Sequence, residues 1–176
     1  KYESLMAITF SLIVIFLYIL LRFRKWQYGM SAIIAVFHDV LITLSLYSIL
    51  YGLLPFNLEI DMAFIAAILT VVGYSINDTV VVFDRIREYL GLHKRKPVNE
   101  IVDDALNSTL SRTINTSMST FIVLLSIFVF GGDSIRGFVF ALMVGVVVGT
   151  YSSLFVATPL LVDLSKNLKS SVEDKE

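Results

Sequence analysis

The sequence contains no cysteine, only three prolines and two histidines, and just 16% of its residues are charged. Without cysteine it has neither a disulfide framework nor a thiolate metal site. His38 and His93 are too far apart in sequence to form a metal-binding motif. The near balance of 14 basic and 15 acidic residues excludes a strong positive field that would attract nucleic acid. Soluble domains average about 25% charged residues, so the shortage of charge argues against that class.

Common catalytic and cofactor motifs are also absent. The sequence has no GxxxxGK[ST] or GxGxxG loop, so nothing supports nucleotide binding. It has no GxSxG and no HExxH, which would indicate a nucleophilic serine or a catalytic zinc. We therefore expect a protein that is not an enzyme and that has no catalytic residues, no metal and no organic cofactor.

Long apolar stretches dominate the chain, which is 56% hydrophobic with a mean hydropathy of +0.79. A bilayer core of about 30 Å requires about 20 mostly apolar residues in a helix. Five stretches qualify, and they predict an all-α integral membrane protein whose transmembrane domain covers 1–165. Three of them would also suit the core of a large soluble protein, but too little polar chain remains to cover them. The predicted spans are 5–21, 30–54, 62–83, 113–130 and 137–162.

The basic residues predict the orientation of these spans. Twelve of the 14 basic residues fall in the first loop, the third loop and the tail, whereas only Lys1 and Arg136 lie on the other side. Because basic loops stay in the cytoplasm, the N-terminus should be outside and the C-terminus inside. The chain starts without Met and without a signal peptide, so we expect a processed protein or a fragment preceded by at least one more span.

Two segments outside the spans have patterns of their own. Residues 98–110, after Pro97, place apolar side chains at helical spacing and predict an amphipathic helix on the cytoplasmic interface. This helix could instead dock a cytoplasmic partner, or be a plain surface helix. Residues 166–176 are polar and predict a disordered cytoplasmic tail.

Small residues recur every fourth position in the last predicted span. Such a ridge lets two helices approach closely in a membrane. It could pack within this chain, which is the simpler interpretation, or form a seam against a second subunit or a homologous half. The ridge consists of Gly137, Ala141, Gly145, Gly149, Ser153 and Ala157.

Asp78 and Arg112 are ionisable residues within or at the edge of predicted spans, where charge is costly and usually functional. The third loop lets their two helices pack side by side, so we expect the two side chains to be partners. Movement of Arg112 toward or away from Asp78 would release or bind a proton, because a nearby cation favours the ionised carboxylate and burial favours the neutral one. The alternatives are a proton relay and a static ion pair. Polar residues around them are Ser75, Asn77, Thr113, Asn115 and Thr116.

His38 and Asp39 lie near the middle of the second predicted span. They could extend a proton path or line a polar cavity. Adjacent helical residues point about 100° apart, so we do not expect them to share one partner. The alternative is local hydrogen bonding to neighbouring serine and threonine residues.

Four sequence blocks carry a close resemblance to the SecF family of bacterial protein-export membrane subunits, including the SecF half of fused SecDF proteins. The likeness covers nearly the whole chain. The blocks are AVFHDVLIT at 35–43, VGYSINDTVVVFDRIRE at 72–88, LSRTINTS at 110–117, and GGDSIRGFVFALMVGVVVGTYSSLFVATPLL at 131–161.

The resemblance implies a bundle of the resistance-nodulation-division superfamily, in the bacterial inner membrane. It implies coupling of the proton-motive force to preprotein translocation, with SecD, SecYEG and, further afield, YajC and YidC as partners. The coupling ion would be H⁺, or Na⁺ as in some marine relatives. Asp78 maps to a proton-pathway aspartate of the family and Arg112 to its functional counterpart. An efflux-transporter half of the same superfamily and a purely structural module are the alternatives.

Overall fold

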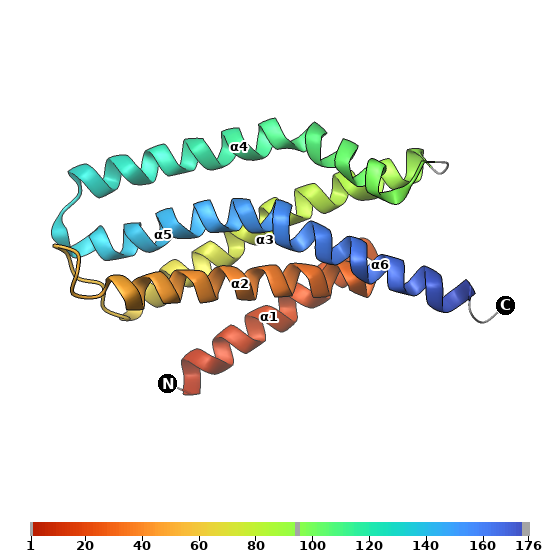
Figure 1. Ribbon diagram of the computed structural model, residues 1–176. Coiled ribbons are helices and arrows are strands. Elements are labelled where there is room, and N and C mark those ends of the chain that lie inside the picture. The colour runs from red at the N-terminus through yellow and green to blue at the C-terminus, as the bar shows by residue number, and fades with distance from the viewer. Residues whose placement is uncertain (1, 94–95, 174–176) are drawn as a thin grey trace.

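The computed structural model describes residues 2–93 and 96–173, and in these residues every element is a helix (Figure 1). In the first and last helices the structure describes the backbone but not the side chains of residues 2–5, 7, 8, 12 and 166–173. The elements are α1 (Tyr2–Phe23), α2 (Trp26–Leu50), α3 (Met62–Leu92), α4 (Val98–Phe130), α5 (Asp133–Ser152), the π-helix η1 (Ser153–Ala157) and α6 (Thr158–Glu173).

Four helical segments in the described residues are long and apolar enough to cross a membrane. They are α2, α3, α4 and the continuous run Asp133–Ser165, which joins α5, η1 and the start of α6. The expectation of five spans is therefore confirmed for four. In α1 the apolar stretch found is Thr9–Phe23, which is shorter than a full span.

Two helix ends differ from those predicted by hydropathy. α2 ends at Leu50 and not at 54, because the chain turns at Gly52, whose φ of 75° suits glycine. α3 continues past residue 83 to Leu92. Its charged last part is held by α1, since Arg22 donates two hydrogen bonds of 2.7 and 2.9 Å to the carboxylate of Asp84.

Residues 98–110 are helical as predicted, but they do not form a helix of their own, because α4 runs without a break from Val98 to Phe130. Ile101, Val102 and Ala105 are buried against the rest of the bundle. The apolar face that suggested a helix lying on the membrane surface is thus covered by the protein itself. At the other end, α6 is helical to Glu173, where the sequence predicts a disordered tail over 166–176, and residues 174–176 lie outside the described part.

α5 lies at the centre of the bundle, where it contacts α2, α3 and α4. Figure 1 shows α4 on one side of α5 and α2 on the other, while α1 diverges from the bundle toward its N-terminal end. Aromatic side chains close both ends of the core. Phe23, Tyr28 and Phe83 stack at one end, and Tyr47 packs on Phe64 at the other.

The ridge of small residues packs within the chain, with Gly145 and Gly149 against α3 and Gly137 against Asn57 and Tyr47. A Cβ atom on Gly145 would stand 2.0 Å from Cγ2 of Val71, and one on Gly149 would stand 3.0 Å from Cβ of Ser75. Because only hydrogen fits at Gly145, the two backbones approach more closely than any side chain there would allow. The ridge therefore sets the distance between α3 and α5.

A π-helical turn, η1, interrupts the long C-terminal helix just before Pro159. Proline has no N–H to donate and its ring clashes with the carbonyl four residues earlier, which favours a wider turn at this point. Thr158 Oγ1 supports the wide turn by donating a 3.0 Å hydrogen bond to the carbonyl oxygen of Ser153. Ser152 and Ser153 lie at the start of this turn and keep right-handed helical backbone angles.

We predict that Gly145→Ala destabilises the protein by about 1–3 kcal/mol, because the added methyl group overpacks the α3–α5 contact. Thermal unfolding of the full-length protein in detergent would measure the change. Gly73→Ala is the matched control, since a Cβ at Gly73 in α3 meets nothing within 4 Å. Equal melting temperatures for the two variants would contradict the close contact.

Candidate functional site

Asp39 lies at the centre of the bundle with a side chain that is 1% exposed. Two serine hydroxyls donate hydrogen bonds to its Oδ2 atom, Ser75 of α3 at 2.5 Å and Ser152 of α5 at 2.8 Å. His38 Nδ1 lies 3.0 Å from Oδ1. Helices α2, α3 and α5 are thus connected by hydrogen bonds to one carboxylate. His38 and Asp39, which we did not expect to share a partner, are in contact with each other.

Asp78 lies one helical turn after Ser75 on α3 and is partly buried. Ser153 of η1 donates a 2.9 Å hydrogen bond to its Oδ2 atom. The Thr79 hydroxyl, on the next residue of α3, is buried without a hydrogen-bond partner among the described residues, and the Thr113 hydroxyl of α4 is also buried. The two intramembrane carboxylates therefore hold the hydroxyls of consecutive serines, Ser152 and Ser153.

Asp78 and Arg112 are not in direct contact, contrary to the expected pairing. Among the described residues Arg112 forms no ion pair within 4.0 Å, and its side chain is exposed. It remains within electrostatic range of Asp78. The helices α3 and α4 do pack side by side, as expected. The two residues therefore lie on neighbouring helices without a direct ion pair between them.

Arg112 faces a charged groove of about 790 Å³ between α3 and α4, at the end where α1 meets α3. Ion pairs organise this groove. Besides the Arg22–Asp84 contact, Arg85 donates a hydrogen bond of 2.8 Å to the Glu88 carboxylate and one of 3.0 Å to the Ser108 hydroxyl. Because charged side chains are mostly exposed to water in proteins, we expect this groove to be hydrated.

The remaining predicted polar residues are spread over other surfaces. Asn77 and Asn115 are exposed, and the exposed Thr116 donates to the Arg112 carbonyl oxygen at 2.9 Å. They do not join the buried cluster. Sequence reasoning missed Ser152 altogether, and it identified Ser153 only as part of the packing ridge. A signal existed in the consecutive serines that follow Gly149 in an apolar span.

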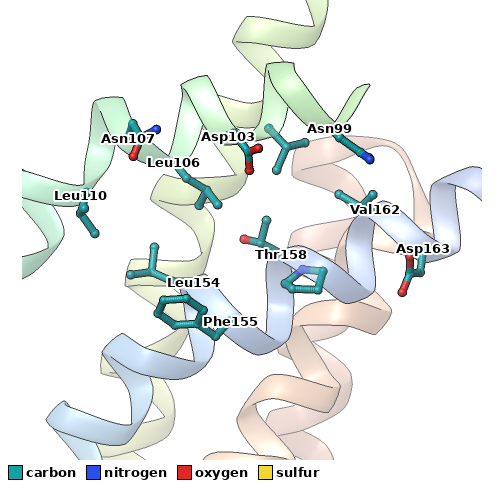
Figure 2. A pocket seen from close by; sticks show the side chains of 12 residues that line it. Asn99, Asp103, Leu106, Asn107, Leu110, Leu154, Phe155, Thr158, Val162 and Asp163 are labelled. Atoms are coloured by element: carbon teal, nitrogen blue, oxygen red, sulfur yellow. The ribbon is translucent and has the colours of Figure 1, made fainter. Parts of the chain in front are cut away.

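A second groove, of about 630 Å³, separates α4 from η1 and α6 (Figure 2). Leu106 and Leu110 of α4 face Leu154 and Phe155 across it, and the polar Asp103 lies on its edge. It contains part of the apolar face that sequence analysis assigned to the amphipathic helix. None of the buried carboxylates lines it, so it is distinct from the polar centre.

Four membrane-length helices around the buried Asp39 and the partly buried Asp78 define a multi-pass membrane protein with an intramembrane polar site. A comparison with known protein families also identifies a membrane protein. The family model described as "Protein export membrane protein SecD/SecF, C-terminal" matches residues 1–167. The chain therefore belongs to the SecD/SecF C-terminal family.

Individual relatives point the same way. The chain is 57% identical over 164 residues to the protein translocase subunit SecF of Rhodothermus marinus, covering 93% of this chain and 53% of that protein. It is 45% identical over 159 residues to the protein translocase subunit SecDF of Brucella abortus, covering 90% and 20%. A crystal structure of SecDF in a super-membrane-facing form matches with a TM-score of 0.89 at 42% identity, over 98% of this chain and 22% of the other. The chain spans about half the length of the SecF relative.

We predict that cysteine introduced at Ser108 reacts with a charged maleimide at least about tenfold faster than cysteine introduced at Thr113, because thiols react as hydrated thiolates. Ser108 lines the charged groove, whereas Thr113 is 1% exposed. Labelling rates in permeabilised membranes would measure the difference, in a full-length protein without other cysteines. Similar rates would show that the groove is closed to water.

Proposed function

We propose that this chain is the membrane portion of an auxiliary subunit of the bacterial Sec protein-export machinery. It couples the proton-motive force to the translocation of preproteins across the inner membrane. Family membership and relatives named SecF and SecDF support an export role. The observation that carries the coupling is Asp78, a carboxylate inside the bundle that is bonded to Ser153 and lies one helical turn before Val81, which lines the charged groove.

In this mechanism Asp78 binds and releases the transported proton. A protonated Asp78 is neutral and compatible with the present separation from Arg112. An ionised Asp78 in a low-dielectric bundle attracts Arg112 strongly. Because Arg112 makes no ion pair among the described residues, its guanidinium is available to move toward the carboxylate. Proton binding and release are thereby converted into movement of α4 relative to α3.

A static brace between Asp78 and Arg112 would require the two side chains to be in contact. The lack of an Asp78–Arg112 ion pair among the described residues therefore favours the relay over the purely structural role that the sequence left open. As in the sequence argument, H⁺ is the preferred coupling ion, with Na⁺ as the variant. The reaction is transport and needs no covalent catalysis.

The topology and partners complete the proposal. We assign α1 as a fifth span, whose apolar stretch is Thr9–Phe23 in the described residues. The N-terminal side lies outside and the C-terminal side lies in the cytoplasm, following the basic loops. SecD is the primary partner, supported by the fused SecDF relative and the SecDF structure. SecYEG is the channel that the subunit assists, and YajC and YidC are accessory partners.

We predict that Asp78→Asn in the full-length protein lowers proton-gradient-dependent preprotein export at least about tenfold, because an amide cannot exchange the proton. Export into inverted membrane vesicles, with and without an uncoupler, measures the gradient-dependent part. Asp133→Asn is the matched control, since the Asp133 side chain is 85% exposed and pairs with Arg136 on the surface.

Three outcomes separate the alternatives. A loss of gradient dependence in a normally assembled Asp78→Asn protein supports the relay. Wild-type export by that variant would show that Asp78 does not carry the proton. Failure of the variant to assemble, with a normal Asp133→Asn control, would identify Asp78 as a structural residue and count against the relay.

A further inference from the structure

Asp39 is the most deeply buried carboxylate among the described residues, and the proposed relay does not use it. Its two serine donors satisfy Oδ2, but hydroxyl groups do not neutralise a charge. A carboxylate taken out of water without a neutralising partner is very costly, so such groups hold a proton or pair with a cation. The only titratable side chain bonded to Asp39 in the described residues is His38.

His38 is suited to exchange a proton with Asp39. Its Nδ1 atom is 3.0 Å from Oδ1, and its side chain is 31% exposed, compared with 1% for Asp39. A proton that passes from the imidazolium Nδ1 to Oδ1 leaves a neutral imidazole and a neutral carboxyl. The pair can therefore hold one proton in either position without leaving an unbalanced charge in the core.

The second link runs to Asp78. Ser152 donates to Asp39 and Ser153, the next residue, donates to Asp78. Each hydroxyl also has a backbone acceptor within reach, at 3.2 Å for the Gly149 carbonyl and 3.0 Å for the Thr150 carbonyl. Because a hydroxyl has one proton to donate, each serine can donate at one time either to the aspartate carboxylate or to the backbone carbonyl oxygen three residues earlier.

This choice depends on the protonation of the carboxylate. An ionised carboxyl accepts the serine proton, whereas a protonated carboxyl can donate its own and release the serine toward the backbone. Both serines lie at the junction of α5 and the π-turn η1, a type of irregularity that often marks functional sites. A change in the protonation of Asp39 or Asp78 thus changes the hydrogen bond donated by Ser152 or Ser153, which are adjacent residues at the same turn.

From this geometry we infer that Asp39 is a second proton-binding site of the bundle, exchanging its proton with His38 and coupled to Asp78 through Ser152 and Ser153. The inference rests on the proposed function, since it assumes that Asp78 takes up a proton during export. The ionisable groups around Asp39 are His38 on its own helix and Asp78 on α3, with Arg112 on α4 beyond Asp78. α5 and η1 contribute hydroxyls to the site.

Asp39→Asn is the primary test, in the full-length protein reconstituted with the export channel. The amide oxygen can still accept from Ser75 and Ser152, so the bundle should assemble, but the side chain cannot bind the exchanged proton. We expect gradient-dependent export to fall at least about tenfold. In pH-difference infrared spectra, the variant should lose one carboxyl C=O signal that Asp78→Asn retains.

Ser152→Ala is the second test, because it keeps the Asp39 carboxyl and removes one donor. We expect the Asp39 infrared signal to shift and gradient-dependent export to fall. Ser45→Ala is the matched control on α2, since the exposed Ser45 hydroxyl donates only to the backbone of Leu41, at 2.7 Å. It should leave both measurements unchanged.

The outcomes distinguish this inference from the proposed function. Wild-type export and an unchanged carboxyl spectrum in Asp39→Asn would overturn the second site, whatever Asp78→Asn does. Should Asp39→Asn fail to assemble, an unchanged signal and rate in Ser152→Ala would overturn it. Loss of export in Asp39→Asn together with wild-type export in Asp78→Asn would instead refute the relay at Asp78 and the coupling between the two sites.

Discussion

The burial of the Asp39 carboxyl between α2, α3 and α5 is the constraint on which the rest of the bundle depends. Oδ2 of Asp39 needs hydroxyl donors from two other helices, Ser75 and Ser152, and these reach it only if the helices have the right rotation and separation. A hydrogen bond buried in a low-dielectric interior is strong when made and costly when lost. The polar centre therefore fixes the rotation and relative position of α2, α3 and α5. Apolar packing alone would define these less strictly.

The small-residue ridge makes this centre possible. Gly145 and Gly149 bring the α5 backbone against Val71 and Ser75, and without that approach the hydroxyl of Ser152 would fall short of Asp39. Aromatic contacts then enclose the centre, with Tyr28 and Phe83 at one end and Tyr47 at the other. Packing and polar contacts therefore depend on each other. The small residues bring α5 close to α3, and this closeness allows the Asp39 carboxyl of α2 to bond to both helices.

Hydropathy predicted the existence of the long helices well, because a lipid-exposed helix must be apolar over a fixed length. It failed where other contacts decide the boundary. α3 continues beyond residue 83, where Ile86 is buried in the bundle and Asp84 pairs with Arg22 of a different helix. α4 includes the segment 98–110, in which Ile101, Val102 and Ala105 are buried. Such interactions join residues far apart in sequence, so a local pattern cannot show them.

The polar site shows the same division. Asp39, Ser75 and Asp78 were identifiable because polar groups are rare in membrane spans. Their partners were not, since Ser152 lies 113 residues from Asp39 and its role depends on helix rotation. Helix geometry explains why both serines are used. Consecutive helical side chains diverge by about 100°, and Ser152 and Ser153 both keep right-handed helical backbone angles at the start of η1. Two consecutive hydroxyls can then serve two carboxyls, Asp39 and Asp78, that lie on different helices. An element that must respond to protonation is best built where the helix is already irregular, because there the backbone can change its hydrogen bonds without breaking a regular ladder.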